Sequence, residues 1–225
     1  MNRTFLKLRK FSTAACLTLI FASFAWSQKH DINTSQQQDG DVKIAAAQFL
    51  VGHELKLEQA ANLREQFILL VRLAPAALAA GETEKARYYA QQLPVVANKI
   101  QSQSKSRYVS YRINFAVHIS NIILGRIALE SGDTKKAKEH LLAAGRITGR
   151  IPPTLASFGP NMLLAKHLIE KGERETVIQY FDLCANFWKI RTDKLEQWKK
   201  DVKEDKMPDF GFNLGAETSY WRSAQ

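Results

Sequence analysis

The sequence predicts an all-α protein of about seven or eight helices, which pack as stacked antiparallel hairpins. Apolar residues recur at intervals of three and four throughout residues 43–206, and this is the period of a helix. The same range has no convincing alternation of apolar and polar residues of the kind typical of strands. Gly81, Gly132 and Gly172 each follow one helical run and precede a polar residue, so we expect tight turns between paired helices.

Composition narrows the class of protein. The chain has 225 residues, of which 45% are hydrophobic and 24% are charged, and these ordinary values exclude collagen-like, wholly disordered and polytopic membrane proteins. The length fits one domain of about 150 residues or two small ones. Two cysteines are too few for a disulfide scaffold or a four-cysteine zinc site. The net charge of +10 raises the question of an anionic partner.

Residues 1–27 have the three parts of a secretory signal. The first ten residues carry four basic side chains and no acid, and residues 11–26 are almost wholly apolar or small. Small residues at Ala25 and Ser27 predict cleavage before Gln28. The apolar run is shorter than the ~20 residues of a membrane span. We expect a periplasmic or secreted protein; an uncleaved anchor and a buried N-terminal helix are the alternatives.

Cleavage would leave a mature chain with a net charge of +6 and a single cysteine. The polar residues 28–40 then predict a disordered leader, and residues 41–206 a helical repeat domain. The remaining cysteine, Cys184, lies on an apolar helical stripe, so we expect it to be buried as a small hydrophobe. An intermolecular disulfide or a reactive thiol is the alternative.

Prolines predict where helices are interrupted. Pro94 lies inside a helical pattern, where we expect a kink or a break. Pro152 and Pro153 are expected to end a helix. Pro160 follows Gly159 and suits the first position of the next helix.

A final helix is predicted before residue 206. Asp193 and Glu196 suit a capping box at its start. Its apolar stripe is Leu195, Trp198 and Val202, whereas its other face alternates in charge, as expected of a helix that caps a repeat array. Residues 207–225 form an irregular apolar tail, which we expect to fold back onto the helices or to dock onto another molecule.

Three windows of the chain share the same internal offsets. The middle window has Leu124-Gly125, then Ala128 and Gly132, and continues with Ala137, Leu141 and Ala144. The outer windows begin at Leu73-Ala74 and Leu164-Ala165. A small residue in each lets two helices approach closely before a glycine turn. This pattern resembles the tetratricopeptide repeat (TPR) family. The glycines are 51 and 40 residues apart, against a family period of ~34, so the repeat length is irregular.

The resemblance implies a right-handed α-solenoid with a concave face that binds proteins or peptides. Some members hold a C-terminal carboxylate with lysine and asparagine on the first helix of each hairpin. Apolar residues such as Ile122 and Leu163 occupy those positions here, so we expect no such clamp. The expected ligand groove contains Arg126, Met162 and Lys166, although solvated surface is the alternative interpretation of the two basic residues.

A second candidate surface lies between Glu84 and Glu130, where the chain has no acid. An anionic envelope polymer, a lipid head group or an acidic protein patch could bind there, whereas export disfavours nucleic acid. Tyr108 and Tyr111 lie on the apolar stripe of Phe115, which favours a role in the core. The basic residues of this alternative surface are Lys85, Arg87, Lys99, Lys105, Arg107 and Arg112.

Motifs for catalysis are absent from the sequence. No two of the five histidines have metal-ligand spacing, and we find no Gly-x-Ser-x-Gly, phosphate-binding loop or dinucleotide fingerprint. We therefore expect no enzyme, no cofactor and no metal. The favoured function is an exported scaffold for a protein or peptide partner, with membrane contact only through an uncleaved signal. An enzyme whose site is assembled from distant residues is a third hypothesis.

Overall fold

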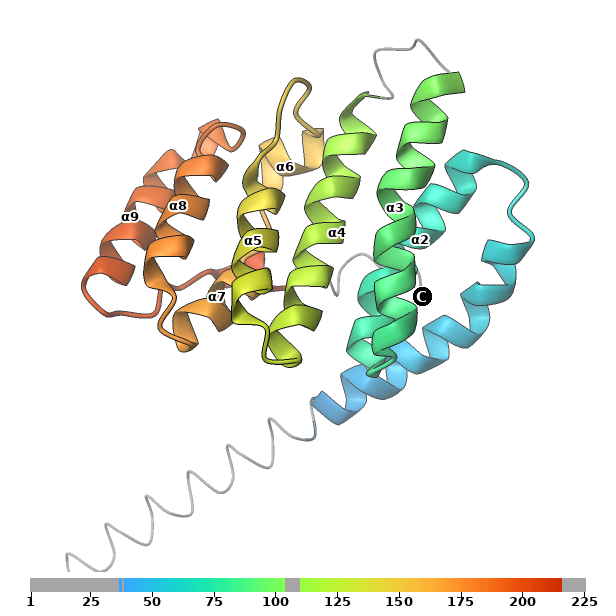
Figure 1. Ribbon diagram of the computed structural model, residues 1–225, viewed down its shortest axis with the longest axis horizontal. Helices are drawn as coiled ribbons and strands as arrows, with labels where there is room; N and C mark the ends of the chain where they lie inside the picture. The colour runs from blue at the N-terminus through green and yellow to red at the C-terminus, as the bar shows by residue number, and fades with distance from the viewer. Residues whose placement is uncertain (1–36, 38, 104–109, 216–225) are drawn as a thin grey trace, which may run out of the picture. The chain divides into compact units, whose positions relative to one another are not determined.

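The computed structural model describes residues 37, 39–103 and 110–215 (Figure 1). The chain divides into two compact units, Met1–Val42 and Lys43–Gln225. In the first unit only residues 37 and 39–42 are described, and they are helical, so the predicted leader is already helical at its end. The predicted secretory signal lies outside the described residues. All regular structure in the described part of the chain is helical.

The second unit is a row of helices that pack in adjacent pairs (Figure 1). The described part holds nine α-helices rather than seven or eight. The first covers 43–58 and is called the edge helix here. The others are α2 (Leu63–Ala80), α3 (Thr83–Gln103), α4 (Ser110–Glu130), α5 (Thr134–Gly145), α6 (Pro153–Phe158), α7 (Leu163–Glu170), α8 (Arg174–Cys184) and α9 (Thr192–Lys203), with short 3-10 helices η1 (Lys189–Arg191) and η2 (Gly211–Leu214). No described helix is both long and apolar enough to cross a bilayer.

The glycine turns confirm the predicted pairing of helices. Gly81, Gly132 and Gly172 have φ angles of 83°, 86° and 83°, the left-handed conformation that ends a helix. Asp133 then caps α5 by accepting a hydrogen bond from the backbone N–H of Lys136 at 2.9 Å. Each turn therefore reverses the chain within a few residues.

Close approach between neighbouring helices depends on the predicted small residues. A Cβ added at Gly125 would lie 2.4 Å from Leu164 Cδ2 and 3.0 Å from His140 Cβ, so α4 packs directly onto α5 and α7 at this point. Ala74 and Ala165, at the equivalent positions of the outer windows, are completely buried. The side chains that pack back across each pair are also completely buried: Ala86, Ala137 and Val177.

The proline predictions need three corrections. Pro94 lies inside a continuous α3, so a break, one of the two outcomes expected there, does not occur, and a kink stays a prediction. Pro153 begins α6 instead of ending a helix, because the first turn of a helix needs no N–H from proline. Pro160 lies in the loop before α7. Gly81 and Gly132 are 51 residues apart because the two helices between them, α3 and α4, have 21 residues each.

The apolar stripes of α8 and α9 are buried as predicted. Cys184 is a free, completely buried thiol, and burial raises its pKa well above the ordinary value. Leu195, Trp198 and Val202 are also buried. The predicted capping box is wrong: α9 begins at Thr192 after η1, so Asp193 lies inside the first turn and caps nothing.

The first part of the tail folds back onto the helices. The Phe210 side chain is 1% exposed, and its ring centroid lies 5.0 Å from that of Trp198. Trp198 Nε1 donates a hydrogen bond to the carbonyl of Asp209 at 2.9 Å. Asn213 Nδ2 donates to the carbonyls of Phe158 and Pro160 at 3.0 and 2.9 Å. The described tail, 207–215, therefore closes the α8–α9 end of the molecule; residues 216–225 lie outside the described part.

Candidate functional site

The predicted groove does not form around Met162. Its side chain is completely buried in the core, and its backbone N–H donates to the carbonyl of Asn213 at 3.0 Å. The returning tail thus lies against the start of α7, where a ligand was expected. Met162 is a core residue, and its assignment to the groove is wrong.

The two basic residues of the predicted groove do lie near each other, beside His167. Burial first, and then the charges of Arg126 and Lys166, lower the pKa of His167. Each base has an acid one turn along its own helix: Arg126 Nη2 lies 4.0 Å from Glu130 Oε1, and Lys166 pairs with Glu170. These pairs reduce the positive charge that the surface could offer to an anion.

The alternative basic surface is divided between two hollows. Lys85 pairs with Glu54 at 2.8 Å, and Arg87 pairs with Glu84 at 3.4 Å, and the two bases line different hollows. The Arg112 guanidinium lies 5.7 Å from the centre of the Tyr111 ring, and Lys99 is exposed. Lys105 and Arg107 lie outside the described residues. The described basic residues therefore do not form one continuous site for an anionic ligand.

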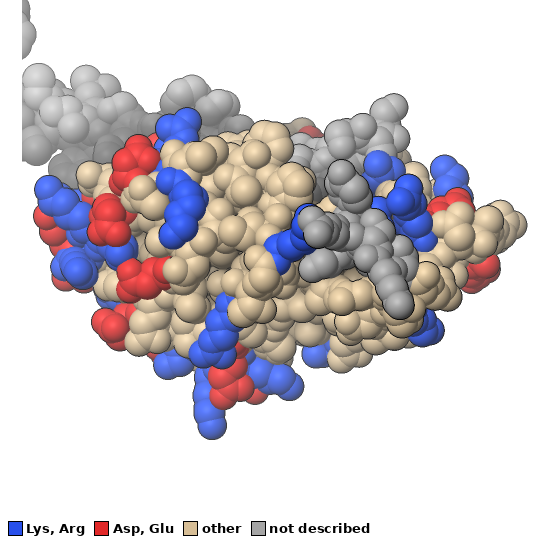
Figure 2. Space-filling view, turned by 90° about the horizontal axis from the view of Figure 1, so that it is seen from above, with Lys and Arg blue, Asp and Glu red and all other residues tan. Residues whose placement is uncertain are grey.

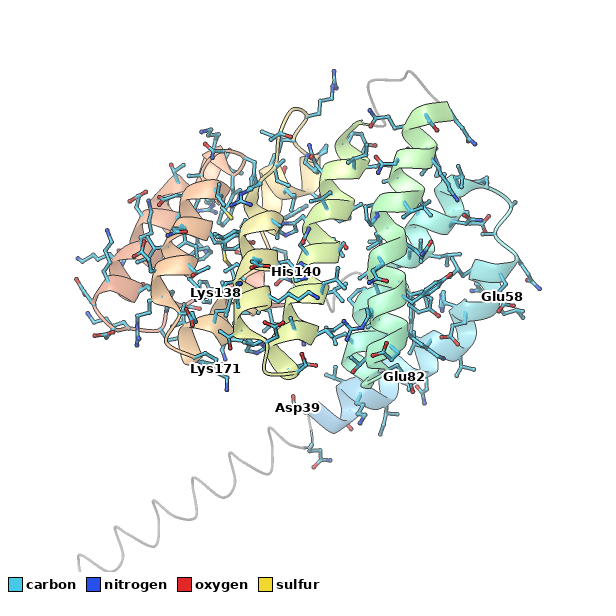
Figure 3. The ribbon with its side chains drawn as sticks, in the orientation of Figure 1. Asp39, Glu58, Glu82, Lys138, His140 and Lys171 are labelled. Carbon is cyan, nitrogen blue, oxygen red and sulfur yellow. The ribbon has the colours of Figure 1, made fainter. Side chains whose placement is uncertain are left out.

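The larger hollow is an open cleft of about 440 Å³ between the edge helix, α2 and α3, which we call the edge cleft. In Figure 3 it lies toward the labelled Glu58, at the end of the edge helix. Apolar side chains and polar groups both line it. The lining residues are Glu54, Leu57, Glu58, Gln66, Leu70, Lys85, Tyr88, Tyr89, Gln92 and Val96.

A hydrogen-bond network holds the wall between the edge helix and α3. Lys85 Nζ donates to both oxygens of Glu54, at 2.8 and 3.1 Å, and the Tyr89 hydroxyl donates to Glu54 Oε1 at 2.9 Å. Burial raises the pKa of Glu54, but these hydrogen bonds and the charge of Lys85 outweigh it, and the pKa is lowered. Burial, then the bond to Glu54, raises the pKa of Tyr89. At neutral pH the network holds a carboxylate, an ammonium and a neutral phenol, each in its ordinary protonation state.

Further polar side chains line the edge cleft. The Tyr88 side chain is 56% exposed, and its ring packs edge-on against Tyr89 with centroids 5.7 Å apart. Gln66 and Gln92 supply amide donors and acceptors, and Glu58 adds an exposed carboxylate. Apolar groups with a few convergent polar groups are typical of a binding site. The arrangement can hold a chain that offers backbone amides and an apolar side chain.

A smaller hollow of about 200 Å³ lies between α3, α4 and α5. Its polar groups already serve the fold: Asp133 caps α5, and His140 Nδ1 lies 2.8 Å from Asn121 Oδ1 (Figure 3). Burial, followed by the charge of Lys136, lowers the pKa of His140. We therefore regard the edge cleft as the better candidate site.

The most perturbed histidine serves the packing of the helices. His118 Nδ1 donates to the carbonyl of Ala144 at 3.0 Å, and its Nε2 accepts from the backbone N–H of Asn161 at 3.3 Å. The Tyr180 hydroxyl donates to the Asn161 carbonyl at 3.0 Å. Burial lowers the pKa of His118 to about 4, so the ring is neutral at pH 7. Among the described residues no three His, Cys, Asp or Glu side chains gather as a metal site would require.

The edge cleft was not predicted from the sequence. Its lining comes from three segments, 54–58, 66–70 and 85–96, which only the fold brings together. Lys85, from the predicted alternative basic surface, is the one predicted site residue that lines it, and the adjacent tyrosines at 88 and 89 were a second visible signal within the basic span. Compared with protein-family models, with curated proteins and with solved structures, the chain gives no match.

Proposed function

We propose that the protein is an exported, non-catalytic scaffold of TPR-like helical hairpins, and that it binds an extended segment of a protein partner in the edge cleft. The observation that carries this proposal is the cleft itself: an open hollow of about 440 Å³ with an apolar floor and exposed polar side chains. The groove predicted further along the chain is covered at Met162 by the tail.

The TPR-like part of the proposal rests on local geometry. Three left-handed glycines end the first helix of each pair, and small buried residues lie where those helices meet their neighbours. Export rests on the basic, apolar and small-residue pattern of residues 1–27. The helical pairs then present their side chains on a rigid support, which suits binding by a preformed surface.

The lining of the edge cleft favours a peptide over a polyanion. Lys85 is paired with Glu54, so the cleft offers little net positive charge. Gln66 and Gln92 can exchange hydrogen bonds with a peptide backbone, while Leu57 and Tyr88 can contact an apolar side chain. Glu58 favours a basic side chain at one end. Because few opposite charges are brought together, binding should depend only weakly on salt.

A capture experiment tests this function. The chain without residues 1–27 is used to capture partners from an envelope extract at low and at high salt. We expect one protein partner at both salt concentrations, and at least about tenfold less of it with the variant Tyr88→Ala/Gln92→Ala. The matched control is Arg126→Glu/Lys166→Glu, which reverses charge on the predicted groove and should capture normally.

Two outcomes would contradict the proposal. Normal capture by the cleft variant, with loss in the control, would place the partner at Arg126 and Lys166. Recovery of only an anionic polymer or lipid that is lost at high salt would favour the basic surface instead.

A further inference from the structure

The edge cleft contains one carboxylate that is left available to a ligand. Glu58 is exposed and lines the cleft at the end of the edge helix (Figure 3). The other acid of the lining, Glu54, accepts hydrogen bonds from Lys85 and Tyr89. No side chain in the described part of the chain forms an ion pair or a hydrogen bond with Glu58. Glu58 is therefore the acid of the cleft that a ligand can neutralise.

The position of Glu58 is unfavourable for the edge helix itself. Glu58 is the last residue of this helix, which covers 43–58. The C-terminal end of a helix carries a partial negative charge, so a carboxylate there destabilises the helix, whereas a basic residue would stabilise it. The fold thus gives no reason for an acid at this position. A cation supplied by a ligand would offset the unfavourable interaction.

The charge of the edge cleft is opposite in sign to that of the whole chain. Its lining holds two carboxylates, Glu54 and Glu58, and one ammonium group, Lys85, so its formal net charge is −1. The chain as a whole carries +10. Because charges act most strongly at short range, the lining favours a cationic group and disfavours an anionic one.

The other walls of the edge cleft suit the stem of a long basic side chain. Leu70 and Val96 lie in the apolar floor and are 3% and 6% exposed. Tyr88 is 56% exposed, and its ring is held edge-on against that of Tyr89. Lysine and arginine cover apolar surface with their methylene groups while the charged end stays in water. A cation near the face of an aromatic ring is also attracted to it.

The free carboxylate and the exposed ring lie on the same side of the edge cleft. Burial and the hydrogen bond to Glu54 raise the pKa of Tyr89, and the negative charge of Glu58 adds to this effect. The Glu58 carboxylate is therefore close to Tyr89, whose ring contacts that of Tyr88. One charged group could contact both Glu58 and Tyr88.

We propose that the edge cleft selects a lysine or arginine side chain of the partner segment, whose charged end lies between Glu58 and the ring of Tyr88. This inference rests on the proposed function, because it names the side chain that the cleft recognises. Glu58 is then the specificity-determining residue. Since Lys85 already neutralises Glu54, the cleft offers one free negative charge and selects a single basic side chain.

Peptide pools test this selection. Acetylated and amidated heptapeptides carry a neutral fluorophore, with the central residue fixed as lysine, norleucine or glutamate and the other positions mixed. Fluorescence polarisation measures their binding to the chain without residues 1–27. Norleucine has the stem of lysine without its charge. We expect the dissociation constant of the lysine pool to be about fivefold lower than that of the norleucine pool, and the glutamate pool to bind most weakly.

Variants assign the selection to Glu58. Glu58→Gln should remove the difference between the lysine and norleucine pools, and Glu58→Lys should make the glutamate pool bind most tightly. The matched control is Glu139→Lys, which changes the net charge equally at an exposed position of α5 and should keep the lysine preference. Neither Glu58 variant should lower the melting temperature, because the side chain is exposed at the end of a helix.

The outcomes separate this inference from the proposed function. Equal binding of all three pools, lost in Tyr88→Ala/Gln92→Ala, would overturn the inference and support the proposed function. Absence of binding by every pool would overturn both. A lysine preference that survives in Glu58→Gln, or that is lost in Glu139→Lys, would show that Glu58 does not select the side chain and would overturn the inference.

Discussion

The two ends of the row of helices differ in what they present to solvent. At one end the edge helix exposes Ile44, Val51 and Leu55 beside an open cleft. At the other end α9 buries its apolar stripe and exposes charged residues, which Figure 2 shows gathered at the α8–α9 end. The terminal units of a helical repeat need a polar outer face when they are not covered. The α9 end meets this requirement and the edge helix does not.

The tail explains how the α9 end is completed. Phe210 fills the space between α8 and α9, in contact with Phe181 and Trp198. Lys199 joins the same two helices, with Nζ 2.7 Å from Asp182. Nothing comparable covers the outer face of the edge helix among the described residues. The comparison teaches that one end is built for stability and the other is available for contact.

The largest expected effect is the loss of the Phe210 side chain, which holds the tail against α8 and α9. We expect Phe210→Ala to lower the free energy of unfolding by about 3–5 kcal/mol, because a fully buried aromatic ring leaves a cavity. Chemical denaturation measures the change. Phe212→Ala is the control, since that side chain is 61% exposed and its loss should cost less than about 0.5 kcal/mol. Similar values for the two variants would show that the tail does not stabilise this end.

Acid should lower the free energy of unfolding through His118. Its pKa is about 4 in the folded state against an ordinary 6.5, so the unfolded state binds the proton first as pH falls. The contribution to stability is complete above about pH 6.5 and is lost progressively down to about pH 4, by roughly 3 kcal/mol. Denaturant unfolding across this range measures it. An unchanged pH dependence in His118→Gln would refute the assignment.

Helical periodicity was sufficient to predict most of the fold. The glycine turns at Gly81, Gly132 and Gly172, and the burial of Cys184, follow from local pattern alone. The errors came from competition between local and tertiary effects. Pro94 is tolerated within α3 because the helix is held along its length by its neighbours, and Asp193 does not cap α9 because η1 leads directly into it.

The candidate site was harder to predict because it depends on contacts between distant segments. Met162 lies on an apolar pattern that fits a groove or a core equally well, and only the returning Asn213 decides between them. The edge helix has the same ambiguity: Val51 and Phe49 are both apolar, but only the packing of α2 and α3 shows which face is covered. Sequence pattern identifies apolar faces without identifying their occupants.

A substitution at the close contact between α4 and α7 should destabilise the fold less than the loss of the Phe210 side chain. We expect Gly125→Ala to destabilise the fold by about 1–3 kcal/mol, because its Cβ would lie 2.4 Å from Leu164 Cδ2. Gly52→Ala, in open space on the edge helix, should instead stabilise the fold by about 0.5–1 kcal/mol. Thermal unfolding at low concentration compares the two. The same sign for both would contradict the packing described for α4.

The smallest expected effect lies in the wall of the edge cleft. Glu54→Gln removes an ion pair with Lys85 that is partly exposed, so we expect a loss of at most about 1 kcal/mol. Partner capture should fall more than stability, because the wall of the cleft loses the charge-assisted bonds that hold Lys85 against the edge helix. Parallel measurement of unfolding and capture separates the effects. Equal losses in both would indicate a purely structural role.

Hydroxyl-radical footprinting tests the difference between the two ends most directly. Oxidation of each aliphatic side chain is read by mass spectrometry. We predict strong oxidation of Val51 and Leu55, which are exposed on the edge helix, and little oxidation of Leu195 and Val202, which α9 buries. Protection of Val51 and Leu55, or strong oxidation of Leu195 and Val202, would contradict the conclusion that the edge helix exposes an apolar face whereas α9 covers its own.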